Sequence, residues 1–372
     1  MAARVKPGRP MRVFMTADAV GGVWQYALDA ARGLRLHGVK TTLAVLGPGP
    51  SADQQAEALA AGVTLIQTDL PLDWTAETPE AVLHAGRVIA ELAAEHAPDL
   101  VHLNSPALAA EARFPAPVVA VCHSCVATWW AAVRGGALPQ EFVWRTDLVR
   151  QGYAAASALT APTAAFAAAT AEVYRLPQAP MIVRNGRRPA TASAGDPEDA
   201  AFTAGRLWDD GKNLATLDRA AARLAIPVEA AGPLQGPNGA RVALQHLRTL
   251  GRLSDEAVAA RLARRPIFVS VARYEPFGLA VLEAAQAGCA LVLSDTPTFR
   301  ELWDGAALFV PADDEAAIAD AIQGLADDPA RRFDVGAAAR ERARAYSVEA
   351  MTDGLLAVYR SLLAKTAETA AA

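Results

Sequence analysis

The stretch IFVSVARYEPFGLAVLEAAQ, residues 267–286, joins an apolar run to a helical pattern through a short loop. Residues 267–271 are mainly β-branched and aromatic, which is typical of a buried strand. Residues 279–286 are mostly alanine and leucine, which favours a helix. Pro276 suits the first turn of this helix, where its missing N–H costs nothing. The stretch therefore predicts one strand–loop–helix unit.

The same alternation continues along nearly all of the 372 residues. Short apolar runs expected to form strands are residues 12–16, 41–46, 63–67, 100–103, 118–121, 158–161, 181–184, 201–204, 228–231, 267–271, 290–294 and 308–310. Alanine-rich stretches such as 24–36, 81–95 and 163–174 separate them as expected helices. This order predicts right-handed βαβ units on parallel sheets.

The pattern breaks after Asn185-Gly186. Residues 187–199 contain two prolines, a glycine and small polar side chains, so we interpret them as an interdomain linker. We predict an α/β protein of two Rossmann-like domains that face each other across a cleft, with ligands at the carboxyl ends of the strands. The expected bounds are 1–186 for the first domain, 187–346 for the second and 347–372 for a helix that crosses back to the first domain.

The composition narrows the class of protein. A net charge of −5 argues against a nucleic-acid partner, because such proteins present a basic surface. No apolar run reaches the length of about 18 residues that would span a bilayer, and the start of the chain lacks the apolar core of a signal peptide. Three cysteines make no disulfide framework. We therefore expect a cytoplasmic protein.

Two carboxylates, Glu275 and Glu283, are eight residues apart in the opening stretch. One precedes the expected helix and the other lies two turns inside it, so both would fall on about the same side. The backbone N–H groups of Phe277, Gly278 and Leu279 would lie at the positive helix end, which suits an anion. Gly278 would let a phosphate approach the backbone. A surface helix with a capping glutamate fits the spacing equally well.

This segment resembles the E-x7-E signature of retaining glycosyltransferases of family 4, which have the GT-B fold. Other pieces of the chain follow the order of that family's motifs. They are Asp18-Ala19-Val20-Gly21-Gly22-Val23, His123, Ala204-Gly205-Arg206-Leu207 with Lys212-Asn213, Ala231-Gly232-Pro233, Leu250-Gly251-Arg252-Leu253, Ser294-Asp295 and Arg300-Glu301-Leu302. Each piece is weak alone, whereas the ordered set is specific and covers essentially the whole chain.

The resemblance also makes the first expected domain the acceptor side and the second the donor-binding domain, and it implies roles for individual residues. Glu275 would contact the hydroxyls of the donor sugar, and Glu283 would bind the ribose hydroxyls. His123 would lie near the sugar, and the backbone of Gly21 and Gly22 would approach the phosphate or the acceptor. Ordinary strand-end and turn roles are the alternatives for His123 and the two glycines.

Arg206 and Lys212 match the family's phosphate-binding stretch and suit the chemistry. A nucleotide sugar releases a diphosphate, so negative charge grows on phosphate oxygens, where a guanidinium fork and an ammonium group can stabilise it. With the helix end they could do so without a metal. We therefore expect no metal and no cofactor, with the nucleotide sugar as substrate. A surface pair of Arg206 with Asp209 or Asp210 is the alternative.

The resemblance implies a retaining, metal-independent hexosyltransferase of polysaccharide biosynthesis, with a UDP- or GDP-linked donor and a glycan, lipid or small-molecule acceptor. No side chain in the motifs is an obvious nucleophile, which favours a front-face mechanism. A nucleotide-sugar epimerase, or a non-catalytic sugar-nucleotide binder, would share the fold. In one departure from the family, Arg187 and Arg188 follow Asn185-Gly186 where apolar and acidic residues are usual.

A dinucleotide-dependent dehydrogenase is a weaker alternative. Gly47-Pro48-Gly49-Pro50-Ser51-Ala52 follows an expected strand, and Asp69 lies about 20 residues further on, as the dinucleotide fingerprint requires. Yet Pro48 and Pro50 remove two N–H donors from the loop that would bind the pyrophosphate. The loop also follows the second expected strand and not the first.

Two further clusters stay open to interpretation. The first is Cys122-His123-Ser124-Cys125, which could indicate a metal site. Cys289 is the one further cysteine of the sequence, so there are too few for a four-cysteine site, and we expect these cysteines to be small buried residues.

The second cluster is Trp129, Trp130 and Trp144. These side chains could stack on an acceptor sugar, contact the inner face of a membrane, or pack between helices.

Overall fold

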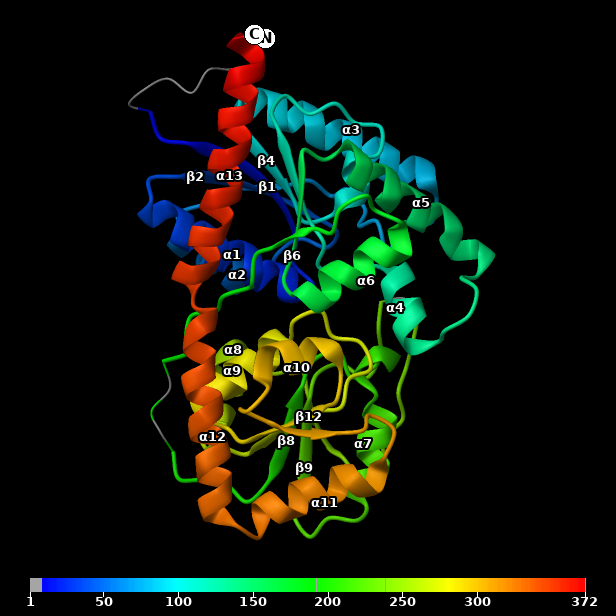
Figure 1. The fold of residues 1–372 in the computed structure, drawn as a ribbon, viewed down its shortest axis with the longest axis vertical. Coiled ribbons are helices and arrows are strands. Elements are labelled where there is room, and N and C mark those ends of the chain that lie inside the picture. The colour runs from blue at the N-terminus through cyan, green and yellow to red at the C-terminus, as the bar shows by residue number, and fades with distance from the viewer. Residues whose placement is uncertain (1–8, 192, 194, 238, 372) are drawn as a thin grey trace. The chain divides into compact units, whose positions relative to one another are not determined.

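The computed structural model describes residues 9–191, 193, 195–237 and 239–371. The chain forms two compact units (Figure 1). The first contains Met1–Ala131, Gly136–Gly186 and Val348–Ala372, and the second contains Ala132–Gly135 and Arg187–Ser347.

Within the described residues, the first unit has a parallel sheet of seven strands in the order β3-β2-β1-β4-β5-β6-β7. The strands are β1 (Arg12–Asp18), β2 (Lys40–Leu46), β3 (Thr64–Gln67), β4 (Leu100–Leu103), β5 (Val118–Val121), β6 (Ala158–Ala161) and β7 (Met181–Ile182). The strand order reverses between β1 and β4, and ligands bind α/β sheets at the carboxyl ends beside such a reversal.

Helices cover both faces of this sheet. They are α1 (Gly22–Leu36), α2 (Ala52–Ala61), α3 (Pro79–His96), α4 (Val126–Val133), α5 (Gln140–Ala155), α6 (Ala164–Tyr174) and α13 (Val348–Ala371), with a 3₁₀ helix over Pro106–Ala109. The last helix, red in Figure 1, packs on α1 and adds Met351, Leu355 and Tyr359 to the core of this unit. The contact is so close that a Cβ atom on Gly33 of α1 would lie 1.9 Å from Thr352 Oγ1.

In its described residues, the second unit has a parallel sheet of six strands in the order β10-β9-β8-β11-β12-β13. The strands are β8 (Ala201–Ala204), β9 (Val228–Ala231), β10 (Arg248–Gly251), β11 (Ile267–Ser270), β12 (Leu291–Ser294) and β13 (Leu308–Val310). The helices are α7 (Leu214–Ala221), α8 (Asp255–Leu262), α9 (Leu279–Ala287), α10 (Pro297–Trp303), α11 (Glu315–Ala326) and α12 (Pro329–Ala343), with 3₁₀ turns over Asp210–Lys212 and Arg344–Tyr346. Separate apolar cores form on the two faces of the sheet.

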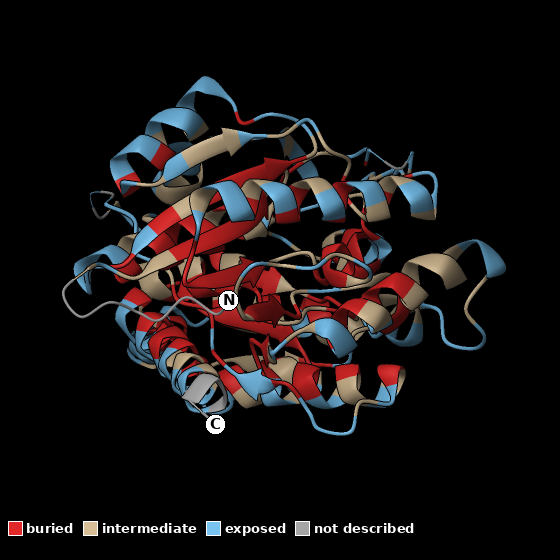
Figure 2. Cartoon of the chain, turned by 90° about the horizontal axis from the view of Figure 1, so that it is seen from above, coloured by how far each residue is buried: buried red, intermediate tan, exposed pale blue. Residues whose placement is uncertain are grey.

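The predicted class, two Rossmann-like α/β domains followed by a C-terminal helix, is confirmed. Figure 2 shows the reason: most strands are buried while the helices expose their outer sides. Buried strands therefore appear in the sequence as continuous apolar runs, and the helices do not. Two predictions are wrong in detail. Strand β10 was not among the expected strands, because it lies at the sheet edge and none of its residues is buried. Strand β7 has two residues, both exposed, where four were expected.

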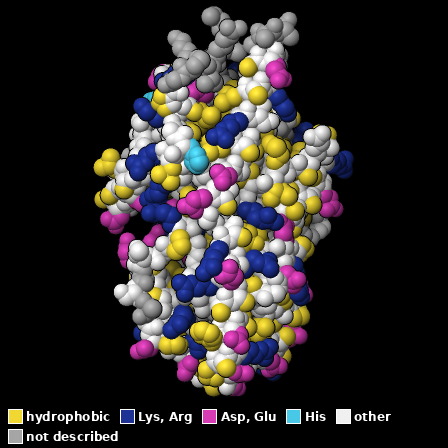
Figure 3. All heavy atoms as spheres, turned by 60° about the vertical axis from the view of Figure 1, so that its left-hand side comes forward, with side chains coloured by type: hydrophobic (Ala, Val, Ile, Leu, Met, Phe, Trp, Pro, Cys, Tyr) yellow, Lys and Arg dark blue, Asp and Glu magenta, His cyan; other side chains and the backbone are white. Residues whose placement is uncertain are grey.

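The surface is mixed in charge. On the face shown in Figure 3, basic and acidic side chains are interspersed. Among the described helices, none combines the length and apolar character needed to cross a membrane.

Candidate functional site

Helix α9 begins three residues later than the sequence predicted. Leu279 is its first residue, and Gly278 precedes it with φ +93°, a left-handed conformation that L side chains rarely adopt. The expected helix start at Pro276 is therefore wrong, and of the three predicted donors only Leu279 belongs to the helix. A Cβ atom on Gly278 would also lie 3.3 Å from Glu275 Cγ and from Phe299 Cε1. Backbone conformation and packing thus require this glycine, whatever ligand approaches it.

Glu275 is paired with Lys212. The Lys212 ammonium group donates to Glu275 Oε2, and the two side chains are 20% and 16% exposed. The backbone brings them together, because Gly211 O accepts from the N–H groups of Arg273, at 2.9 Å, and Tyr274, at 3.2 Å. Two predicted site residues, 63 positions apart, therefore meet at the carboxyl end of β11.

Asn213, next to Lys212, explains part of the local sequence pattern. Its side-chain Nδ2 donates to Val271 O at 3.1 Å and to Ala312 O at 2.8 Å. Its backbone is left-handed, with φ +59°, a conformation that asparagine tolerates better than most residues. Asn213 therefore holds the Lys212 turn against the end of β11.

Arg206 lies at the end of β8 and pairs with Asp209, with 3.0 Å between Nη2 and Oδ2. Its side chain is 47% exposed, so the guanidinium still faces solvent. The turn before it is tight: a Cβ atom on Gly232, at the end of β9, would lie 1.8 Å from Gly205 O. Both glycines have positive φ, +147° at Gly205 and +144° at Gly232. The two glycine motifs therefore allow β8 and β9 to end in touching loops.

Glu283, on α9, accepts from Arg187, with 2.7 Å between Arg187 Nε and Glu283 Oε1. The side chains are 14% and 26% exposed. Sequence reasoning noted Arg187 only as a departure from the family pattern. The second unit thus places three predicted site residues, Arg206, Lys212 and Glu283, in ion pairs, and Glu275 completes one of these pairs.

His123 lies in the first unit, just beyond β5, and its partner is an amide. His123 Nε2 is 2.7 Å from Asn104 Oδ1, while Asn104 Nδ2 donates to Thr16 O at 2.7 Å. Because the Asn104 amide N–H faces Thr16, its oxygen accepts, so Nε2 of His123 carries the proton. Burial lowers the pKa of His123 to about 3, with a contribution from His102. The imidazole is therefore neutral.

A buried aromatic cluster supports this histidine. The Tyr26 ring meets the His123 ring edge-on, with centroids 4.6 Å apart. His102, on β4, lies 3.4 Å from the Tyr26 hydroxyl and 2.6 Å from the Tyr359 hydroxyl on α13. Burial lowers the pKa of His102 to about 4, so this ring too is neutral near pH 7. Asn104 and Tyr26 escaped sequence reasoning, because neither belongs to a motif.

The glycine loop after β1 leaves room for a ligand. Gly21 precedes α1 and Gly22 is its first residue, and a Cβ atom on Gly21 would meet nothing within 4 Å. Asp18 Oδ1 accepts from Val20 N at 2.9 Å and shapes the turn. Asp73 lies nearby: burial raises the pKa of its carboxyl, and the charge of Asp18 adds to this, while hydrogen bonds oppose it.

The alternative motifs have structural explanations. Ser51 caps α2 through a reciprocal capping box with Gln54, so the proline-containing loop begins an ordinary helix. Burial raises the pKa of the Cys122 and Cys289 thiols to about 12, which makes them poor nucleophiles. Within the described residues, no group of three His, Cys, Asp or Glu side chains could hold a metal ion.

The tryptophans after His123 are half-buried among their neighbours. Trp130 contacts the rings of Trp129 and Phe142, with centroids 6.3 and 5.9 Å away, and the Arg145 guanidinium lies over Trp144 at 4.3 Å. Packing accounts for these contacts, and a role in acceptor or membrane binding stays a prediction.

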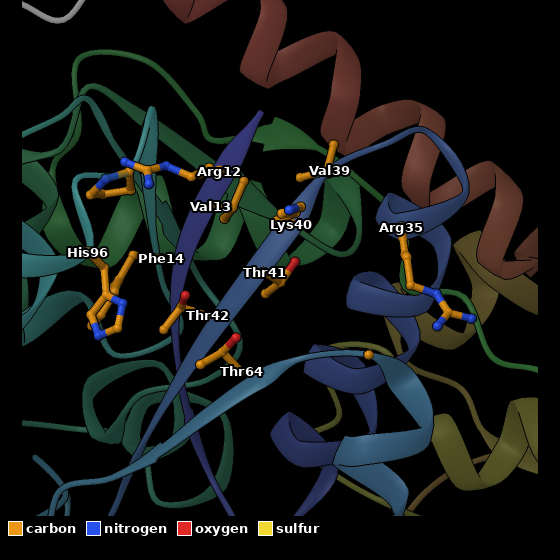
Figure 4. A pocket seen from close by; sticks show the side chains of 12 residues that line it. Arg12, Val13, Phe14, Arg35, Val39, Lys40, Thr41, Thr42, Thr64 and His96 are labelled. Atoms are coloured by element: carbon orange, nitrogen blue, oxygen red, sulfur yellow. The ribbon is translucent and has the colours of Figure 1, made fainter. Parts of the chain in front are cut away.

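A cavity of about 400 Å³ lies at the amino ends of β1, β2 and β3 (Figure 4). The predicted site residues of the first unit follow the carboxyl ends of its strands instead. Arg12 and His96 lie on one side of the strands and Arg35 on the other. Because these basic groups do not converge, the cavity presents no single anion site.

Family models match both parts of the chain. One described as Glycosyltransferase Family 4 matches residues 20–189, and one described as Glycosyl transferases group 1 matches residues 240–342. Among solved structures, sucrose-phosphate synthase from Thermosynechococcus elongatus has a TM-score of 0.74 at 17% identity, over 95% of this chain and 100% of that one. HepE from Anabaena, solved with UDP and glucose, has a TM-score of 0.70 at 15% identity, over 95% and 100%. The fold and these domains define a GT-B glycosyltransferase.

The chain belongs to the glycosyltransferases of family 4 and group 1. Among curated relatives, a glycogen synthase of Mycobacterium tuberculosis is 26% identical over 392 aligned positions, which cover 89% of this chain and 90% of that protein. A phosphatidyl-myo-inositol mannosyltransferase of Mycolicibacterium smegmatis is 33% identical over 120 residues, 32% of this chain. The match spans only 31% of that mannosyltransferase.

Proposed function

We propose that this glycosyltransferase moves a hexose from a UDP- or GDP-linked donor, with retention at the anomeric carbon and without a metal. The observation that carries the proposal is the Lys212–Glu275 pair at the carboxyl end of β11, followed by α9 with Glu283. A cation, a carboxylate and a helix N-terminus lie at one loop, and the second carboxylate lies within the helix that follows. These groups suit the phosphates, sugar hydroxyls and ribose hydroxyls of a nucleotide sugar.

In this proposal the bond between the anomeric carbon and the phosphate oxygen breaks while the acceptor hydroxyl oxygen bonds to that carbon. The acceptor proton passes to the departing phosphate oxygen, so the products are the glycoside and the nucleoside diphosphate. Lys212 and Arg206 stabilise the charge that grows on the phosphates. Glu275 accepts from Lys212 and from sugar hydroxyls, and it is not a nucleophile of the kind found in retaining glycosidases.

The acceptor is a glycan or a lipid in this proposal. Two relatives, the glycogen synthase and the phosphatidyl-myo-inositol mannosyltransferase, support these two classes by their names. The UDP bound to HepE supports a uridine nucleotide as the first donor to test. We propose a cytoplasmic enzyme that meets a lipid-linked acceptor at the inner face of a membrane. Cosedimentation with acceptor-bearing vesicles tests that last point.

Calorimetric titration with UDP-, GDP- and ADP-sugars, followed by transfer assays with glycan and lipid acceptors, tests the proposal. We expect micromolar to millimolar binding of one nucleotide class and a product with the donor's anomeric configuration by NMR. Conversion of the donor sugar without any acceptor would instead identify an epimerase. Binding without turnover on any acceptor would identify a non-catalytic binder.

A further inference from the structure

Arg187 is the residue at which the chain enters the second unit, and its side chain points to the predicted ribose-binding carboxylate. Besides the 2.7 Å bond from Nε to Glu283 Oε1, its Nη2 lies 3.5 Å from Asp255 Oδ2. The side chain is 14% exposed. A guanidinium at this depth, bonded through Nε, is fixed in a way that an exposed arginine is not.

The backbone of Arg187 is held as well. Its N–H donates to Tyr346 O at 3.3 Å, and its carbonyl accepts from Gln286 Nε2 at 2.8 Å. Gln286 lies three positions after Glu283, so both side chains project from one face of α9. Arg187 therefore contacts α9 at two points, and its side chain cannot leave Glu283 by a hinge motion of its own backbone without breaking these bonds.

This rigidity bears on whether Arg187 blocks the carboxylate or positions it. A carboxylate has about four lone-pair sites, so a carboxylate bonded to a guanidinium can still accept from the hydroxyls of a ribose. A glutamate free to rotate would lose side-chain entropy when a ribose binds, and this loss weakens binding. A glutamate already held by a fixed guanidinium has lost that entropy in advance.

We propose that Arg187 is a positioning residue that holds the Glu283 carboxylate ready for the ribose hydroxyls of the donor. This proposal rests on the proposed function, because it takes Glu283 as the ribose ligand. It assigns a role to the arginine that departs from the family pattern. Arg187 acts through Glu283 and does not itself touch the nucleotide.

The test compares a ribonucleotide with its 2′,3′-dideoxy analogue. The probes are UDP, GDP and ADP with the corresponding dideoxynucleoside diphosphates, titrated calorimetrically into the full chain and into R187Q, R187K and E283Q. R188Q is the matched control, because Arg188 is the exposed neighbour of Arg187. Thermal unfolding midpoints check that every variant is folded.

We expect R187Q to bind the ribonucleotide roughly twofold to tenfold more weakly, because Glu283 is then no longer fixed before the ribose binds. Its affinity for the dideoxynucleotide should match that of the unchanged protein. In the E283Q background, R187Q should have no further effect. R187K keeps the positive charge but lacks the guanidinium fork, so its affinity for the ribonucleotide should lie between those of R187Q and the unchanged protein. If R187Q does not fold, R187K serves for the same comparison. R188Q should bind like the unchanged protein.

Several results would overturn the proposal. Tighter ribonucleotide binding by R187Q would mean that Arg187 blocks the site. An equal loss with ribo- and dideoxynucleotides, persisting in E283Q, would mean that Arg187 contacts the phosphates. Unchanged discrimination by R187Q would mean that it does not position Glu283. If the unchanged protein binds none of the nucleotides, the proposed function is wrong, and this proposal, which depends on it, is wrong too.

Discussion

The carboxyl edges of the two sheets use different chemistry. In the first unit, His123 is neutral and bonded to an amide, and the nearby His102 is neutral and bonded to a tyrosine. In the second unit, the corresponding edge is built from charged pairs, including Lys212 with Glu275. The two edges suit different parts of a nucleotide sugar. Charged side chains suit a departing diphosphate, whereas neutral donors and acceptors suit sugar hydroxyls. We therefore expect changes in the second unit to affect phosphate chemistry most.

The largest expected effect follows from Lys212→Met. It removes one charge-assisted contact with the phosphates and leaves Glu275, 16% exposed, without its lysine. Each such contact is worth about 1.5–3 kcal/mol, so kcat/KM should fall roughly tenfold to a hundredfold. Steady-state transfer kinetics measure this loss. Lys40→Met, on an exposed residue at the amino end of β2, is the matched control. Unchanged kcat/KM in Lys212→Met would show that the charge of Lys212 does not stabilise the departing diphosphate, against the contrast drawn between the two edges.

The second prediction concerns acid sensitivity. Burial lowers the pKa of His102 to about 4, below its ordinary value of 6.5, so the unfolded chain binds the proton more readily. Stability of the first unit should therefore fall as pH drops below about 6.5, by about 2 kcal/mol at pH 5 from His102 and by about as much from His123. In the second unit, burial would raise the pKa of the Asp218 carboxyl, but three backbone N–H donors lower it. The contribution of Asp218 to stability is lost only as the pH falls below its ordinary pKa of 3.8.

Hydrogen exchange followed by mass spectrometry at pH 7 and pH 5 measures each unit separately. After correction for intrinsic exchange rates, the core of the first unit should lose more protection than that of the second. His102→Gln should remove about half of this pH dependence, because His123 contributes the rest. Equal losses in the two units would contradict the assignment of buried neutral imidazoles to the first.

Much of the fold could be predicted from the sequence, because short apolar runs alternate with alanine-rich stretches and this alternation indicates the βαβ order. The misses have physical reasons. An edge strand such as β10 buries little and leaves no apolar run. The start of α9 depends on the left-handed Gly278, and a proline three residues from a helix start signals its place only approximately.

The site was less predictable than the fold. Motifs pointed to single residues, whereas the structure pairs residues that are far apart in sequence, such as Arg187 with Glu283, 96 positions away. Such a pairing depends on how the chain enters the second unit, which no local pattern encodes. The Asn104–His123 bond is similar, because it joins the ends of neighbouring strands β4 and β5.

A third prediction tests the neutral edge. Asn104→Leu removes the acceptor that fixes the His123 ring, so kcat should fall about tenfold while free-nucleotide affinity stays unchanged. Asn104→Asp should restore the hydrogen bond but raise the pKa of His123, because a carboxylate stabilises the imidazolium. Its pH–rate profile should therefore shift to higher pH. Full activity of Asn104→Leu at every pH would show that the His123 orientation has no role in transfer.

The smallest expected effect is that of chelation. Cations of the second unit meet the phosphate charge in this account, so transfer should proceed at an unchanged rate in EDTA. Assays with EDTA, and with added Mg²⁺ or Mn²⁺, measure this. Loss of turnover in EDTA with rescue by either metal would mean that an ion supplies part of the charge attributed to Arg206 and Lys212.

The most direct test of the central claim separates Glu275 from Glu283. The ribose contact is similar in ground and transition states, so Glu283→Ala should mainly weaken donor and free-nucleotide binding. The sugar changes charge and shape during transfer, so Glu275→Ala should lower kcat strongly while free-nucleotide affinity barely changes. The measurement pairs nucleotide titration with steady-state kinetics on variants shown by melting to be folded. Abolished nucleotide binding in Glu275→Ala, with unchanged binding in Glu283→Ala, would contradict the account.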